Sequence, residues 1–244
     1  MLDYLTRSLS NHYEPVRELR HTEVSRITLY RHLQKDHRLV VIRSRNSNDS
    51  VYEKLVGTEH PNLVKIYDFI SLPDELIILE EYIEGISLRE KIGVHGIDKK
   101  TVKRYMSSLC NAVDFLHFRN IIHRDIKPEN IILCGDTLKL IDFNIARVFN
   151  DKKDRDTMKF GTVQYASPEQ FGLMQTYQAS DIYSMGVLMN EMLTGVHPTI
   201  KNASGRLGRI VRRSTRLQAD QRYKNVIAFK KAICGGINRC LRLR

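Results

Sequence analysis

The 244-residue sequence contains no tryptophan and only four cysteines, Cys110, Cys134, Cys234 and Cys240. No two of them are spaced as C-x-x-C, and no pair of histidines stands at the spacing of a zinc finger, which argues against a structural zinc site. Reduced thiols packed as ordinary side chains are therefore the expected state.

Long apolar runs are also missing. No stretch approaches the roughly 18–20 consecutive apolar residues that a membrane-spanning helix needs, which predicts that there is no integral membrane segment. The N-terminal stretch MLDYLTRSLSNHYEP is polar and lacks the apolar core of a secretory signal. A cytoplasmic location is expected where the protein is made, and export into another cell stays open.

Acidic residues are nearly absent from the C-terminal fifth. Between Lys201 and Arg244, 13 Lys or Arg residues stand against one acid, Asp220, so this stretch carries +12 and the first 200 residues carry −1. Such a run is either a solvated helical face or a surface for an acidic protein, a nucleic acid or an anionic membrane. Few aromatic side chains interleave with these charges, which argues against nucleic acid. The basic C-terminal region, with its tail 234–244, is expected to select an acidic partner.

The first 84 residues are typical of a small sheet with one helix. SRITLYRHL and RLVVIRS flank the polar turn QKDH and predict a hairpin over residues 25–45. LVKIYDFI and ELIILEEYI, joined by SLPD, predict a second hairpin. Between them, SNDSVYEKLVGTEHPN predicts a short helix that starts at an Asn or Asp cap and ends before Gly57 and Pro61.

After Gly85 the pattern becomes mainly helical. In TVKRYMSSLCNAVDFLHFRN the apolar residues recur near helical spacing, at Val102, Tyr105, Met106, Leu109, Val113, Phe115 and Leu116. NIIL and TLKLIDF predict two short strands, and a polar stretch over 150–156 predicts a mobile loop. Further helices are expected in SDIYSMGVLMNEMLTG, GRLGRIVRRSTRL and YKNVIAFKKAICG. We therefore expect a single α+β domain over 1–244, with an N-lobe at 1–84, a C-lobe at 85–233 and a tail at 234–244.

Residues that carry chemistry are concentrated in IIHRDIKPENIIL, residues 121–133. This segment supplies a carboxylate at Asp125, an amine at Lys127 and an amide at Asn130, and a second carboxylate, Asp142, ends the apolar strand LKLID. Oxygen ligands suit Mg²⁺. A carboxylate that orients a hydroxyl and accepts its proton suits phosphoryl transfer. One such aspartate alone is usually a cap, but the combination at this spacing indicates phosphoryl transfer.

These residues resemble, in order, the motifs of the eukaryotic-type (Hanks-type) Ser/Thr protein kinases. The matching segments are His123-Arg124-Asp125, Asn130, Asp142-Phe143-Asn144 and Ser167-Pro168-Glu169. The resemblance covers about residues 17–233 and includes GTVQYASPE. It implies a two-lobed protein kinase-like fold, with a small β-rich N-lobe that holds one helix and a larger, mainly helical C-lobe. It also implies ATP and Mg²⁺ as cofactors and serine or threonine of proteins as the phosphate acceptor.

The resemblance assigns catalytic roles position by position. Asp125 would be the catalytic base, Lys127 the lysine that steadies the γ-phosphate, and Thr162 the residue that links the substrate-docking loop to Asp125. Asn130 and Asp142 would bind the metal and, through it, the nucleotide. Lys127 and Thr162 resemble the Ser/Thr subgroup of the family rather than the tyrosine subgroup.

Other roles implied by the resemblance concern the hinge, regulation and support. Backbone groups from Glu81 to Ile83 would bind adenine, with Glu80 at the gatekeeper position. Arg124 would pair with a phosphate on the activation loop, for which Thr157 is the candidate acceptor; an ordinary exposed threonine is the alternative. The supporting groups would be a buried ion pair between Glu169 and Arg222 and a loop anchor at Asp181.

The first lobe departs from the family pattern. The Gly-rich loop aligns with LRHTEVSRIT, where Arg20, Thr22 and Ser25 take the glycine positions, so contact with phosphates should be looser. In VVIR, Arg43 is expected at the position of the phosphate-binding lysine. Val41 is expected at that of the small residue over adenine, which narrows the pocket.

Three more departures follow along the chain. The family's helical glutamate falls at Val51, and Glu53 would reach Arg43 only if the helix were rotated or shortened. Asn144 replaces a glycine, a mild change because asparagine tolerates left-handed backbone better than most residues. The segment after HPT is short, which predicts a reduced helix G.

Three functions are consistent with these residues. The first is an active Ser/Thr protein kinase that uses ATP and Mg²⁺ and phosphorylates itself among other proteins. The second is a pseudokinase that acts as a binding or scaffold module, because the nucleotide-gripping residues are altered. The third, a small-molecule phosphotransferase, is disfavoured by the docking-loop segment GTVQYASPE.

Overall fold

The computed structural model describes residues 9, 11–45, 48–149, 162, 164–171 and 177–235. The chain divides into two compact units. The first unit is Met1–His60 with Val64–Glu84, and the second is Pro61–Leu63 with Gly85–Arg244. The expected mobile loop at 150–156 lies outside the described residues, as does nearly all of the tail.

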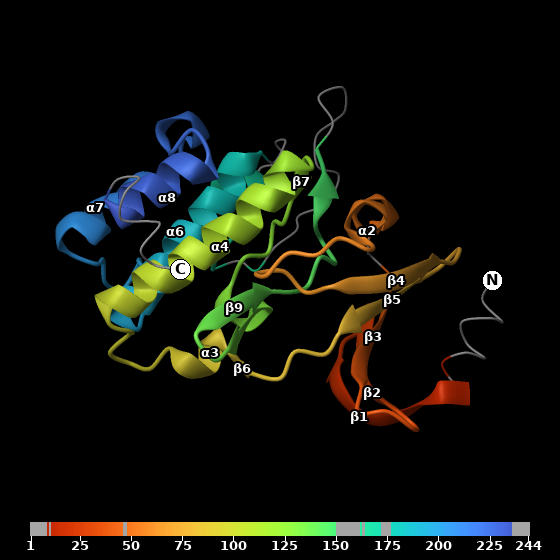
Figure 1. Cartoon of the computed structure of the whole chain (residues 1–244). Helices are drawn as coiled ribbons and strands as arrows, with labels where there is room; N and C mark the ends of the chain where they lie inside the picture. Colours follow the sequence, from red (N-terminus) through yellow and green to blue (C-terminus); the bar gives the residue numbers. More distant parts are fainter. Residues whose placement is uncertain are drawn as a thin grey trace. The chain divides into compact units, whose positions relative to one another are not determined.

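A five-stranded antiparallel sheet with strand order β1-β2-β3-β5-β4 forms the first unit, together with one helix (Figure 1). The elements are β1 (Tyr13–His21), β2 (Ser25–His32), β3 (Arg38–Ser44), α2 (Asp49–Leu55), β4 (Ile66–Ser71) and β5 (Leu76–Glu81). The two predicted hairpins and the helix are confirmed. The side chain of Asn48 caps the helix by accepting a hydrogen bond from the Ser50 N–H. Strand β1 was not predicted, because its sequence YEPVRELRH is polar and mostly exposed.

The turn between β1 and β2 takes the place of the Gly-rich loop. It closes without glycine, since the Thr22 N–H donates to the Ser25 carbonyl at 2.8 Å and the Thr22 hydroxyl accepts from the Ser25 N–H at 3.0 Å. Among the described residues, positive φ at non-glycine positions occurs only at Asn120, Arg124 and Asp142. The turn therefore forms without the positive φ angles that favour glycine.

The two faces of the sheet bury different partners. Helix α2 packs on the face that carries Phe69, whose ring centroid lies 6.2 Å from that of Tyr52. Phe69 pairs across strands with Ile78, and Ile78 pairs with Ile42, so these side chains share the α2 face. The opposite face holds a second apolar cluster: Leu39, Val41, Ile70, Ile77 and Leu79, against Leu9, Tyr13, Tyr30 and Leu72.

Helices dominate the second unit. Its elements are β6 (Ile86–Ser87), α3 (Leu88–Lys91), α4 (Lys99–Phe118), β7 (Ile121–Ile122), the 3₁₀ turn η1 (Pro128–Asn130), β8 (Ile131–Cys134), β9 (Thr137–Leu140), β10 (Arg147–Val148), α5 (Pro168–Phe171), α6 (Gln178–Thr194), α7 (Gly205–Ser214), η2 (Ala219–Gln221) and α8 (Val226–Cys234). Helices α4 and α6 lie side by side, with α7 packed on α6 and α8 on α4 (Figure 1). The main helices and the two strands β8 and β9 were predicted.

The apolar stripe expected on α4 is buried, with one exception. Val102, Met106 and Leu116 are fully buried. Phe115 is only half-buried, and the guanidinium of Arg119 lies 3.7 Å from its ring centroid. This ring therefore supports a cation–π contact rather than the core.

The structure agrees with the predicted reduction of helix G. Residues 195–204 are all described and form no helix between α6 and α7. The buried side chain of Asn190 holds this connection, since its amide donates to the Lys201 carbonyl at 2.8 Å and accepts from the Ala203 N–H at 2.8 Å. Side-chain hydrogen bonds therefore order the segment where a helix is missing.

Candidate catalytic site

A buried aspartate holds the backbone of the predicted catalytic loop. Asp181, on the first turn of α6, is fully buried and accepts hydrogen bonds from the N–H groups of His123 at 3.0 Å and Arg124 at 2.9 Å. The ring of His117 on α4 adds a third contact at 2.8 Å. Burial alone would raise the pKa of Asp181, but these partners outweigh burial and keep its pKa below the ordinary value. The anchoring role expected for Asp181 is confirmed.

Asp125 is the centre of a dense hydrogen-bond network in this loop. Its Oδ2 accepts from Lys127 Nζ at 2.6 Å and from Asn130 Nδ2 at 3.0 Å. Its Oδ1 accepts from the Thr162 hydroxyl at 2.9 Å, and Lys127 Nζ also donates to that hydroxyl at 2.7 Å. The second unit thus brings together all three residues predicted to be catalytic and one predicted metal ligand.

This network also sets the charge of Asp125. Burial would raise the pKa of the carboxyl, but the nearby charge of Lys127 and the hydrogen bonds from Lys127 and Thr162 outweigh that effect and lower the pKa below its ordinary value. Asp125 is therefore ionised at neutral pH. An ionised carboxylate in a fixed orientation is able to accept a hydroxyl proton.

The segment that carries Asp142 is tied to the same loop. The Ile141 N–H donates to the Asn130 carbonyl at 3.0 Å, and the Ile141 carbonyl contacts His123 Nε2 at 3.2 Å. His123 Nδ1 accepts from the Asp125 N–H, so Nε2 carries the proton and donates to Ile141. Asp142 itself has left-handed backbone, with φ of 68°, and its Oδ1 accepts from the Asn144 N–H at 3.2 Å.

Asn144 does not need left-handed backbone in this structure. Asn144, which replaces the family's glycine, was thought able to take left-handed backbone, yet the left-handed residue in this segment is Asp142. Asparagine at position 144 therefore carries no such strain. The structure gives a reason why this departure from the family pattern is tolerated.

The docking segment after Thr162 is anchored to the helices by a buried ion pair. Arg222 is 2% exposed and reaches both oxygens of Glu169, at 2.6 and 2.8 Å. Its remaining donors contact backbone carbonyls, including that of Ala179 at 2.9 Å. Burial alone would raise the pKa of Glu169. The charge of Arg222 and the hydrogen bonds that Glu169 accepts outweigh burial and hold this pKa below its ordinary value. The predicted Glu169–Arg222 pair is confirmed.

A second polar cluster beside the loop was not predicted. Arg89 on α3 donates from Nε to Glu129 Oε1 at 2.7 Å and from a terminal nitrogen to the Tyr165 hydroxyl at 2.6 Å, and it also pairs with Glu191 on α6. Tyr165 in turn donates to Glu191. The cluster ties α3, the catalytic loop, the docking segment and α6 together. No spacing in the sequence signals it, because its members lie up to 102 residues apart.

The residues predicted for regulation are placed only in part. Arg124 is buried, at 5% exposure, and the side chain of Gln170 donates to its carbonyl at 2.9 Å. Thr157 lies outside the described residues. The pairing of Arg124 with a phosphorylated Thr157 stays a prediction.

In the first unit, the placement of Arg43 does not support its predicted role. The family's lysine on this strand pairs with a glutamate of the helix, so it must lie on the α2 face. Arg43 is cross-strand from Ile77, on the opposite face, and pairs with Glu75 at 2.7 Å rather than with Glu53. The α2 face of β3 presents Ile42, one residue earlier.

Val41 shares the face of Arg43. It is buried in the second apolar cluster rather than on the α2 face, so its expected contact with adenine is not supported either. Val51 is fully buried and offers no carboxylate. Among the predicted adenine contacts, Glu81 ends β5 and its N–H donates to the Lys65 carbonyl at 2.9 Å, and Ile83 is half-buried just beyond. Glu80 is buried on the α2 face, opposite Val40.

Comparison with known proteins agrees with the fold. The family model described as "Protein kinase domain" matches residues 13–243. The chain is 32% identical over 211 residues to the serine/threonine-protein kinase PknB of Mycolicibacterium smegmatis, covering 79% of this chain and 34% of that protein. It is 37% identical over 143 residues to the serine/threonine-protein kinase PrkC of Bacillus subtilis, covering 57% of this chain and 22% of that protein.

The chain combines an antiparallel-sheet unit with a helical unit that holds an aspartate-centred loop. The chain belongs to the protein kinase domain family, of Hanks-type Ser/Thr kinases, and has the two-lobed α+β fold of that family. The matches span between about a fifth and a third of the length of the two relatives named. In the described parts of the chain, no helix is long and apolar enough to cross a membrane.

Proposed function

We propose that the chain transfers the γ-phosphate of ATP to serine or threonine of proteins, itself included, with Mg²⁺ as the cation. The observation that carries the proposal is Asp125, an ionised and largely buried carboxylate held by Lys127, Asn130 and Thr162. Preorganised groups of this kind stabilise a transition state without reorganising at the moment of reaction. The names of the relatives support the same reaction class.

In this proposal each residue of the loop has one task. Asp125 orients the acceptor hydroxyl and takes its proton. Lys127 neutralises charge on the transferred phosphoryl group, and Thr162 fixes the docking segment to the carboxylate. Backbone groups of Glu81 and Ile83 bind adenine.

The donor set of Asn130 and Asp142 fits Mg²⁺. The amide nitrogen of Asn130 is occupied by Asp125, which leaves the amide oxygen as its group for a cation. The hydrogen bond from Ile141 to the Asn130 carbonyl keeps the Asp142 segment beside it. Oxygen ligands are what Mg²⁺ prefers, and the bound ion would neutralise developing charge on the phosphates.

A specific observation favours the second candidate, a pseudokinase that binds partners without transfer. Arg43 lies on the face of β3 opposite α2, the α2 face carries Ile42 instead, and Val51 stands at the position of the lysine's glutamate partner. Losing one charged contact to phosphate costs a few kcal/mol, and each 1.4 kcal/mol is about tenfold in rate. Thermal-shift titration with Mg-ATP tests one version of this candidate: a Mg-dependent rise in Tm excludes a pseudokinase that binds no nucleotide.

The placement of Arg43 makes a sharp prediction. Arg43→Ala should change the transfer rate and the KM for ATP by less than about twofold, because only an exposed ion pair with Glu75 is lost. Lys127→Ala, tested beside it, should lower the rate strongly. Initial rates over a range of Mg-ATP concentrations measure both. A tenfold or greater fall in kcat/KM for Arg43→Ala would show that Arg43 acts as the family's lysine after all.

A further inference from the structure

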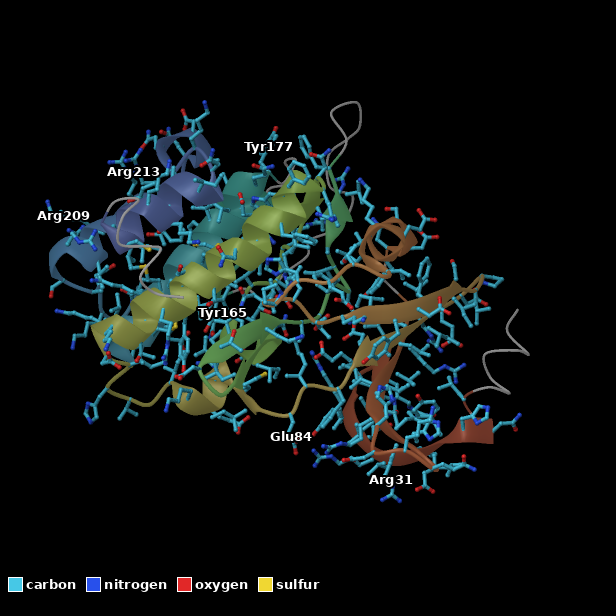
Figure 2. The ribbon with its side chains drawn as sticks, viewed as in Figure 1. Arg31, Glu84, Tyr165, Tyr177, Arg209 and Arg213 are labelled. Atoms are coloured by element: carbon cyan, nitrogen blue, oxygen red, sulfur yellow. The ribbon has the colours of Figure 1, made fainter. Side chains whose placement is uncertain are left out.

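Helix α7 and the residues just after it carry four exposed arginines. Arg209, Arg212 and Arg213 follow the spacing i, i+3, i+4 on α7, which places them within one stripe of the helix, and Arg216 follows two residues after the helix ends at Ser214. All four are exposed, whereas Leu207, Ile210, Val211 and Ser214 bury the other face. Figure 2 labels Arg209 and Arg213 at the surface of this helix. We call these four residues the arginine stripe.

Ordinary solvation does not explain the arginine stripe well. Solvent-exposed helix faces usually mix charges of both signs, and like charges three or four residues apart destabilise a helix by about 0.2–0.5 kcal/mol per pair. The helical part of the stripe contains two such pairs, Arg209–Arg212 and Arg209–Arg213. The helix dipole favours cations in the last turn, which accounts for Arg212 and Arg213. It does not account for Arg209, in the middle of the helix.

Within the described residues, no acidic side chain pairs with the arginine stripe. None of its members forms an ion pair with a described residue, and Asp220 is the one acid between residues 201 and 235. Arg213 lies over the Tyr223 ring at 4.5 Å, and Arg216 contacts the Gln221 side chain at 3.4 Å. Arg209 and Arg212 have no contact of either kind in this part of the structure. The guanidinium groups are thus available to an external anion.

We propose that the arginine stripe binds an Asp- and Glu-rich segment of a partner protein. Guanidinium forks match carboxylates in a planar, bidentate geometry. Leu217, 75% exposed and adjacent to Arg216, offers an apolar contact that suits a peptide side chain. Between residues 201 and 235 no aromatic side chain is among the exposed large apolar groups, so bases have no stacking platform there. The surface is separate from the catalytic loop, and its binding does not depend on phosphoryl transfer.

The test measures binding directly with a defined probe. A fluorescein-labelled peptide of ten glutamates and one leucine is titrated with the full chain at 0.15 M salt, and anisotropy reports the Kd. The variant Arg209→Glu/Arg212→Glu/Arg216→Glu should bind at least about tenfold more weakly, since each reversed exposed charge changes affinity a few-fold. Arg213 is left in place because it packs on Tyr223.

A matched charge reversal serves as the control. Lys91→Glu/Lys99→Glu/Lys100→Glu changes net charge equally at exposed positions of the same unit and should keep the wild-type Kd within about threefold. Both variants should keep Tm within about 2 °C of the wild type. Asp125→Asn should bind the peptide as the wild type does, which separates this proposal from the proposed transfer.

Three outcomes overturn the proposal. The first is equal weakening by the two triple variants, which means that net charge alone attracts the peptide. The second is tighter binding of the wild type to an eleven-nucleotide single strand or to phosphatidylserine vesicles than to the peptide, if the stripe variant also weakens that binding. The third is the absence of saturable peptide binding.

Discussion

Asp125→Asn lowers the rate of phosphate transfer to serine or threonine by about 10²–10⁴-fold, the range that a general base contributes. The substitution keeps the shape of the side chain and removes the charge that Lys127, Asn130 and Thr162 surround. An amide accepts a hydroxyl proton far less readily than a carboxylate does. Single-turnover transfer of labelled phosphate at saturating Mg-ATP measures the fall.

The control for this prediction is a second Asp→Asn change at an exposed position. Asp136 is 89% exposed and pairs only with Arg104 at 2.7 Å among the contacts described. Asp136→Asn should leave the rate within about twofold, because exposed pairs contribute little. Equal rates for Asp125→Asn and wild type, with Tm unchanged in both, would remove Asp125 from the mechanism.

Arg222→Ala should destabilise the second unit by about 3–5 kcal/mol. The substitution leaves the carboxylate of Glu169 buried without its cation and frees backbone carbonyls, including that of Ala179. In a chain of this size that loss corresponds to a fall in Tm of roughly 6–20 °C. Calorimetry or circular dichroism measures it, and Arg209→Ala is the matched control because its side chain is exposed.

The same pair predicts a pH dependence. The pKa of Glu169 is lower in the folded chain than its ordinary value of 4.5, so the pair contributes its full stability above about pH 4.5 and loses it as pH falls through the folded pKa. The difference in stability between wild type and Arg222→Ala should therefore narrow in acid. A difference that stays constant down to pH 3 would show that the cost arises from packing rather than from the ion pair.

Local patterns predicted much of the fold. Alternating β-branched runs around short polar turns identified four strands of the first unit, and the 3.6-residue period from Val102 to Leu116 identified α4. Strand β1 was not predicted because most of its side chains are exposed. Its hydrogen-bonded pairing with β2, rather than its composition, makes it a strand. The exposed residues of β1 lack the alternating burial that marks a half-buried strand.

The catalytic loop was predictable because its parts are close in sequence. Asp125, Lys127 and Asn130 lie within six residues, and the structure joins their side chains. The side-chain direction of Arg43 was not predictable, because a shift of one residue in the pairing of a strand moves every side chain to the other face. Only the register with β5 assigns Arg43 to the face opposite α2.

The Arg89 cluster shows the same limit at longer range. Arg89, Glu129, Tyr165 and Glu191 come from four elements that only the tertiary fold brings together. Each residue alone has the character of an ordinary surface group. Their contacts are therefore a property of packing, which no local pattern in the sequence encodes.

The central claim is that the loop around Asp125 transfers phosphate although the α2 face of β3 offers Ile42 in place of a cation. The most direct test is incubation of the purified wild-type chain with Mg-ATP, followed by mass spectrometry of the chain and of an added protein substrate. We predict phosphoserine or phosphothreonine that requires Mg²⁺ and is lost in Asp125→Asn. No phosphorylated residue at saturating Mg-ATP, in a chain that still unfolds cooperatively, would contradict the account.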